Sequence, residues 1–104
     1  MISRHWKGIA RPERADDYVR HLRTQTFPGL ARLPGFVRAS ILARPTAEGT
    51  EFQIVTVWQS LEAIRAFAGD SLDVAVVPSA VQELMVRYDL KVFHYEIVES
   101  FEPR

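Results

Sequence analysis

Side chains that can exchange a proton near neutral pH are few in this chain, which has three histidines and no cysteine. His21 follows Tyr18 by three residues, a spacing that puts both side chains on one face of a helix. An imidazole and a phenol there can serve as base and hydrogen-bond donor. We therefore take Tyr18 and His21 as candidate catalytic residues. The alternative is that His21 only lies at the border of the helix.

The other two histidines, His5 and His94, lie in segments expected to form the first and last strands. In an antiparallel pair the residue numbers of opposite positions have a constant sum. If that sum is about 99 here, the two imidazoles stand opposite each other. Such a pair could form an acid/base site or a metal site. Two nitrogens without a third ligand hold a metal poorly, so we predict no metal. His94 is kept as a third candidate catalytic residue.

A tryptophan occupies the point where a strand passes into a helix, in the stretch VTVWQSLEAIRAFAG from Val55 to Gly69. Trp58 there can be a core plug whose indole N–H has a partner, or the wall of a pocket. Along the strand it lies on the same face as Phe52 and Ile54, the face expected to pack against the helices. We predict the wall, with one face of the ring open toward the space between the sheet and the first helix.

The composition argues against several classes of function. Thirteen basic and thirteen acidic residues cancel, without a run of one sign, so the charge pattern of a nucleic-acid or membrane-surface binder is missing. The lack of cysteine excludes disulfides, thiolate metal sites and iron-sulfur clusters. Because phosphate-binding and dinucleotide-binding motifs are also missing, we expect no cofactor. Neither a signal peptide nor an apolar run of bilayer length is seen, so we predict a cytoplasmic protein.

Hydrophobic periodicity and turn residues predict a single domain over residues 1–104 with the order β-α-β-β-α-β. Pro28 should kink or break the first helix, because proline has no N–H to donate. The expected helices start at Pro12, Ser60 and Pro78 and run to about Leu22, Gly69 and Tyr88, with a short piece at Leu30 to Leu33. The expected strands are Ile2 to Ala10, Phe36 to Arg44, Glu51 to Gln59 and Leu90 to Ser100.

This order is the split pattern of ferredoxin-like domains, an α+β fold in which helices cover one face of a four-stranded antiparallel sheet. The second face has no cover within the chain. Val55 and Val57 lie on that face, although a solvent-exposed face is usually polar. We therefore predict that a second copy of the chain covers it in a homodimer.

Three segments of the chain resemble the antibiotic biosynthesis monooxygenase-like family: FPGLARLPGF, VWQSLEAIRAFAGD and RYDLKVFHYEIVE. In that family two protomers pack sheet against sheet as a dimeric α+β barrel, and each keeps a cleft between sheet and helices. Some members oxidise polycyclic phenols with dioxygen and no cofactor, and some degrade haem. Trp58 matches the family's tryptophan at the end of the third strand, which lines the cleft. The asparagine that both kinds of enzyme use has no counterpart here, since the sequence contains none. The segment after Trp58 up to Tyr88 also lacks the histidine that would ligate haem iron.

Two classes of function stay open at this point. The first is a cofactor-independent monooxygenase that acts on an aromatic or polyketide-like small molecule. The second is a non-catalytic dimeric domain that binds a small apolar ligand or only itself. A cleft onto which Trp58, Tyr18 and a histidine converge would favour the enzyme, whereas a cleft filled by Phe27, Phe67 and Leu84 would favour the second class.

Candidate substrate-binding residues complete the expected site. They are large side chains expected to border the cleft, together with an arginine on the second strand that could hold an anionic oxygen. These residues are Trp58, Phe27, Phe67 and Arg38.

Overall fold

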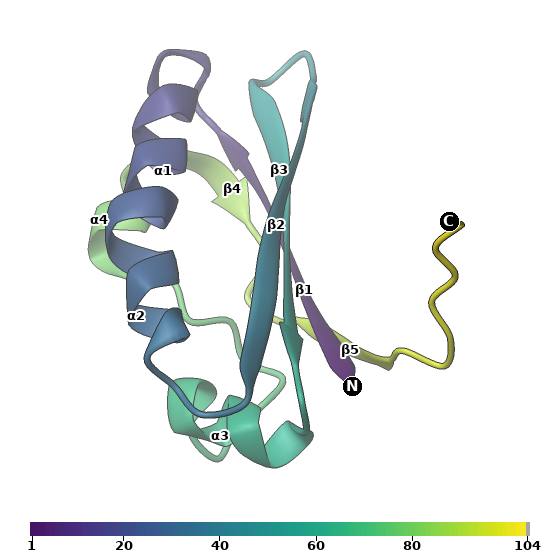
Figure 1. Cartoon of the computed structure of the whole chain (residues 1–104). Helices are drawn as coiled ribbons and strands as arrows, with labels where there is room; N and C mark the ends of the chain where they lie inside the picture. The colour runs from purple at the N-terminus through teal and green to yellow at the C-terminus, as the bar shows by residue number, and fades with distance from the viewer. Residues whose placement is uncertain (104) are drawn as a thin grey trace.

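The computed structural model describes residues 1–103 and shows an antiparallel sheet with its helices on one face (Figure 1). This is the predicted α+β, ferredoxin-like arrangement. The strands are β1 (Ile2–Ala10), β2 (Phe36–Pro45), β3 (Thr50–Trp58), β4 (Met85–Tyr88) and β5 (Phe93–Glu96). The helices are η1 (Pro12–Arg14), α1 (Ala15–His21), η2 (Leu22–Thr26), α2 (Phe27–Ala31), α3 (Leu61–Ala68) and α4 (Ser79–Gln82).

The sheet has the strand order β2-β3-β1, with β4 and β5 both on the far side of β1. β4 pairs with β1 over Gly8 to Ala10, and β5 pairs with it over Ile2 to His5. The two short strands thus share the position that we expected one final strand to fill. β1 lies in the middle of the sheet, so its side chains have neighbours on both sides.

The first helix stays helical through Pro28, so the predicted break is wrong. η1 is a 3₁₀ turn, α1 follows it, and η2 is a π-helical segment that leads directly into α2. In η2 the turn widens, and the N–H of Phe27 reaches the carbonyl of Leu22, five residues back. A π segment accommodates a local interruption of the α-helical hydrogen bonds. The chain thereby passes the missing N–H of Pro28 without a kink that ends the helix.

The predicted helix from Pro78 to Tyr88 is wrong over its second half. α4 ends at Gln82, and Met85–Tyr88 forms β4 on the free edge of β1. The unpaired N–H and C=O groups at the edge of β1 offer this segment hydrogen-bond partners, which outweighs its helical spacing. By contrast, α3 begins and ends as expected. The hydroxyl of Ser60 accepts a hydrogen bond from the N–H of Ala63, and Gly69 at the other end has a φ of 76°.

The predicted alternation of β3 is confirmed, because its helix-facing residues lie in the core. Phe52 and Ile54 pack with Tyr18 and Leu22 of the first helical stretch. A second cluster joins Trp58 to Leu30 and Ile64. Within residues 1–103, the structure has no helix with the length and hydrophobicity needed to cross a bilayer.

Candidate active site

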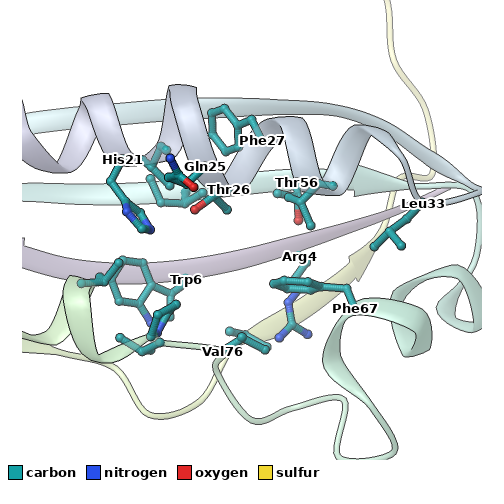
Figure 2. A pocket seen from close by; sticks show the side chains of 18 of the residues that line it. Arg4, Trp6, His21, Gln25, Thr26, Phe27, Leu33, Thr56, Phe67 and Val76 are labelled. Carbon is teal, nitrogen blue, oxygen red and sulfur yellow. The ribbon is translucent and has the colours of Figure 1, made fainter.

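A cavity of about 430 Å³ lies between the sheet and the helices (Figure 2). This volume is within the range of small-molecule binding pockets. Its walls come from β1, β3, the stretch from α1 to α2, α3 and the loop before α4. The aromatic lining residues are Trp6, Tyr18, Phe27 and Phe67, and the polar ones are Arg4, His21, Gln25, Thr26 and Thr56.

Tyr18 and His21 line the cavity together, as their spacing predicts. Tyr18 is 3% exposed, and its hydroxyl has no hydrogen-bond partner within residues 1–103. In this part of the chain every fully enclosed polar side-chain atom has a hydrogen-bond partner. Because the Tyr18 hydroxyl has none, it is not fully enclosed, and Tyr18 lines the cavity. Burial raises the pKa of the Tyr18 hydroxyl well above its ordinary value, because the phenolate would lose its hydration. Tyr18 is therefore neutral and can donate a hydrogen bond.

His21 is half-buried and extends from the helix into the cavity opposite Trp6 (Figure 2). Gln25, one turn further along, lies beside it on the same face. No side-chain hydrogen bond occupies the imidazole within residues 1–103, so both of its nitrogens are free to meet a ligand. Of the three histidines, His21 is the one whose side chain lines the cavity.

Trp58 does not line the cavity, and the prediction that one face of its ring is open is wrong. The residue has an exposed fraction of 0%. Its ring packs edge-on against Phe36 and is stacked with Phe67, at centroid distances of 5.2 and 6.1 Å. Its indole N–H donates to the hydroxyl of Thr56 over 2.9 Å. Phe67, which covers Trp58 and lines the cavity, occupies the place expected for the tryptophan.

The tryptophan that does border the cavity is Trp6 on β1, which the sequence reasoning missed. Its ring packs near Tyr18 at 6.1 Å, and its indole N–H donates to the carbonyl of Asp89. A methyl group at Gly8 would lie 2.6 Å from the Trp6 ring, so the glycine leaves room for the indole to lie along the strand. The signal was available in the alternation of β1 and in the glycine two positions after the tryptophan.

The expected pairing of His5 with His94 is wrong by one residue. His94 stands opposite Arg4, and His5 stands opposite Phe93. The residue numbers of paired positions therefore add up to one less than expected. A shift of one residue moves a side chain to the other face of a sheet. His5 therefore lies on the open face, in contact with Ser3, whereas His94 lies on the helix-covered face.

His94 makes its contact with Arg4, the second cavity residue that sequence reasoning missed. Nη1 of Arg4 donates to Nε2 of His94 over 2.9 Å. Since a guanidinium can only donate, Nε2 must carry the lone pair. Burial and, secondarily, the Arg4 charge lower the pKa of His94, which favours the same neutral form. His94 is thus close to the cavity through Arg4 but is not among the residues that line it.

The remaining predicted residues divide between the two faces of the sheet. Phe27 and Phe67 line the cavity. Arg38 is exposed and pairs with Val57, so it lies on the open face and not at the cavity. No cluster of three or more histidine, aspartate or glutamate side chains that could hold a metal ion occurs in the described part of the chain.

Several solved structures share this fold. A protein from Bacillus cereus assigned to the antibiotic biosynthesis monooxygenases superposes with a TM-score of 0.70 at 15% identity, over 100% of this chain and 97% of that one. SnoaB, a cofactor-independent oxygenase from Streptomyces nogalater, gives 0.65 at 15% identity over 98% and 97%. A heme-degrading protein from Mycobacterium tuberculosis gives 0.60 at 19% over 99% and 98%. At these identities the likeness concerns the fold.

Sequence comparison supplies the family. No curated protein matches the chain at the sequence level. The profile of the family described as "Antibiotic biosynthesis monooxygenase" matches residues 1–71, more than half of the chain. This match covers β1 to α3 and therefore most of the walls of the cavity. The chain belongs to the antibiotic biosynthesis monooxygenase family.

Proposed function

We propose that this protein is a cofactor-independent monooxygenase that acts on an aromatic small molecule. The observation that carries the proposal is the cavity, in which aromatic walls surround a free histidine and a neutral tyrosine hydroxyl. Flat aromatic side chains suit a planar ligand. His21 and Tyr18 supply the base and the hydrogen-bond donor that the reaction requires. The family and the fold of SnoaB agree with this assignment.

The chemistry begins with the removal of a proton from an acidic C–H group of a phenol-like substrate by His21. Tyr18 donates a hydrogen bond to the oxygen on which negative charge develops. The electron-rich substrate reduces dioxygen, a carbon–oxygen bond forms, and protonation gives a hydroperoxide. Loss of water then leaves a carbonyl group, so a CH₂ group and O₂ become C=O and H₂O. The substrate supplies all the electrons.

His94 is the less suitable base. Its basic nitrogen Nε2 already accepts a hydrogen bond from Arg4. Proton uptake there would break this bond and place two cations side by side. We therefore assign the proton transfer to His21 and give His94 the task of positioning Arg4.

Oxygen consumption with anthrone as the substrate tests the proposal. An oxygen electrode should record enzyme-dependent uptake of one O₂ per anthraquinone formed. His21→Ala should lower kcat about 100-fold or more, the usual contribution of a general base. His5→Ala is the matched control, because His5 lies on the opposite face of the sheet.

Three results would contradict this function. If anthrone and 1,4-naphthohydroquinone bind without enzyme-dependent oxygen uptake, the non-catalytic ligand-binding alternative is correct. If uptake disappears after treatment with a chelator and returns with a metal, the reaction is not cofactor-independent. Stoichiometric haem binding with loss of the porphyrin ring in the presence of a reductant would instead indicate haem degradation.

We also propose that two copies of the chain form a homodimer through the open face of the sheet. Large apolar side chains are exposed there: Leu42, Phe93 and Tyr95 have exposed fractions of 50%, 63% and 57%. A stable interface should bury more than about 1,000 Å² in total, and covering this face would remove these side chains from water. Val57 is a poor probe of the interface, because it is already buried within one chain, with an exposed fraction of only 4%.

Sedimentation of a charge variant tests the dimer. Leu42→Asp should shift the protein toward the monomer at micromolar concentration, because an aspartate in the contact would be buried without a partner. Leu61→Asp is the matched control, since Leu61 is exposed to a similar extent, 45%, but lies on α3. A wild-type monomer would contradict the proposal.

The cytoplasmic location stays a prediction, which cell fractionation can check.

A further inference from the structure

Arg4 is a buried positive charge that has no negative partner in the described part of the chain. Its side chain borders the cavity, yet the residue is only 5% exposed. Among the ion pairs formed within residues 1–103, none includes Arg4. Burial lowers the pKa of Arg4, as expected for a charge that has lost hydration and gained no counter-charge. Buried charges in proteins are usually paired, and residues 1–103 supply no anion for this one, so a bound anion is the expected partner.

The guanidinium keeps hydrogen-bond donors for a ligand. Nη1 donates to the carbonyl of Leu72 at 2.6 Å and to His94 at 2.9 Å, and Nη2 donates to the carbonyl of Val74 at 3.1 Å. A guanidinium has five N–H groups, which leaves the Nε–H and one N–H of Nη2. Nε and Nη2 share one edge of the planar group, the edge that a carboxylate engages with both oxygens.

The surroundings hold the guanidinium in place and offer little competition for these donors. Its three protein acceptors are all neutral, two carbonyls and the imidazole of His94. The ring centroid of Phe67 lies 5.6 Å from the guanidinium carbon, and Figure 2 shows this ring next to the Arg4 side chain. The nearby hydroxyl of Thr56 already accepts a hydrogen bond from Trp58, so its own proton is available to donate into the cavity.

We propose that the cavity binds an aromatic carboxylate, with the carboxylate group on the free edge of Arg4. The inference rests on the proposed function only in that the same cavity would hold the substrate. In this pose the aromatic rings extend along the cavity toward Trp6 and His21, which lie at the end away from Arg4 (Figure 2). The acidic C–H group of the substrate would then lie away from its carboxylate, and Arg4 would be a binding residue that sets the orientation.

Calorimetric binding of a matched probe pair tests the inference. 2-Naphthoate and 2-naphthamide have nearly the same shape, but only the first is charged at pH 7.5. The wild type should bind the naphthoate at least about tenfold more tightly, as expected when a charged pair replaces a neutral contact. Arg4→Gln should bring the two affinities to within about twofold by weakening the naphthoate alone. Arg38→Gln, on the open face, should keep the full preference.

A second variant keeps the test decisive if Arg4→Gln fails to fold after losing its bonds to Leu72 and Val74. Arg4→Lys retains the charge but not the two-pronged edge, so it should keep only part of the preference. The inference is overturned if the wild type binds both probes equally or binds neither at about 1 mM, or if a folded Arg4→Gln variant keeps the preference. Oxygen uptake is measured separately, so a charge preference without uptake refutes only the proposed function, and uptake without the preference refutes only this inference.

Discussion

The two tryptophans occupy opposite situations on the same face of the sheet. Trp58 is enclosed by Phe36 and Phe67 and donates its N–H to the neighbouring Thr56. Trp6 lies along β1 with its ring bordering the cavity, and its indole N–H donates a hydrogen bond to the carbonyl of Asp89. α3 begins just after Trp58 and folds back over it, whereas Trp6 borders the open cavity between the sheet and the helices. A tryptophan beside a strand-to-helix turn thus becomes core, and one in mid-strand is left to form a wall.

The largest expected effect is on the stability of the Trp58 region. Trp58→Ala should lower the free energy of unfolding by about 3 to 5 kcal/mol, the range for a large aromatic side chain lost from a packed core. Urea denaturation followed by circular dichroism measures this loss. A loss below about 1 kcal/mol would mean that the ring is not enclosed, and the comparison of the two tryptophans would fail.

The same truncation at the other tryptophan should act mainly on binding. Trp6 is only half-buried, so Trp6→Ala should cost less than about 3 kcal/mol of stability. It removes an aromatic wall, and 2-naphthamide should bind measurably more weakly. In fluorescence titrations, a Trp58→Phe protein should keep the quenching by 1,4-naphthoquinone and a Trp6→Phe protein should lose most of it. The reverse pattern would show that Trp58 is the wall after all.

A smaller effect is expected from the glycine beneath Trp6. Gly8→Ala puts a methyl group 2.6 Å from the Trp6 ring, so the indole must move. Overpacking of this kind costs about 1 to 3 kcal/mol, and the displaced ring should alter ligand affinity. Gly29→Ala is the control, because it lies in α2 with no atom within 4 Å of the added methyl group, and it should be neutral or stabilise the helix by about 0.5 to 1 kcal/mol. Equal melting temperatures for the two variants would contradict this account.

The smallest expected effect is a pH dependence from the two strand histidines. Burial lowers the pKa of both His5 and His94 below the value of 6.5 that applies in the unfolded chain. At pH values just below 6.5 the unfolded state therefore binds more protons than the folded state. The free energy of unfolding should be at its plateau above this pH and fall as the pH drops toward the lowered values. His94→Gln should reduce this slope in urea titrations, and an unchanged slope would remove His94 from the explanation.

Much of the fold follows from local sequence patterns. The sequence predicts the strand Ile2–Ala10 with its observed bounds, and the caps of α3 at Ser60 and Gly69 are those that the sequence indicates. The alternation of β3 correctly separates the helix-facing side chains from the others. Each of these features depends on residues within a few positions of one another, and backbone geometry alone sets their period. The pairing of Tyr18 with His21 at the cavity has the same origin.

Other features were decided by contacts between distant segments. Met85–Tyr88 became a strand because β1 had a free edge, and no pattern within the segment contains that information. The register of β5 placed His94 beside Arg4, although a shift of one residue would have placed it beside His5.

The enclosure of Trp58, the position of Trp6 at the cavity and the burial of the Arg4 charge likewise belong to the tertiary structure. Each depends on which side chains of other elements fill the adjoining space: Phe67 fills it at Trp58, and an open cavity is left at Trp6. The residue types and their spacing determined the family of folds, the face on which each strand residue lies, and the pair of groups available for proton transfer. Which of these groups meet, and where space for a ligand is left, depends on the packing of elements far apart in the sequence, which local periodicity does not encode.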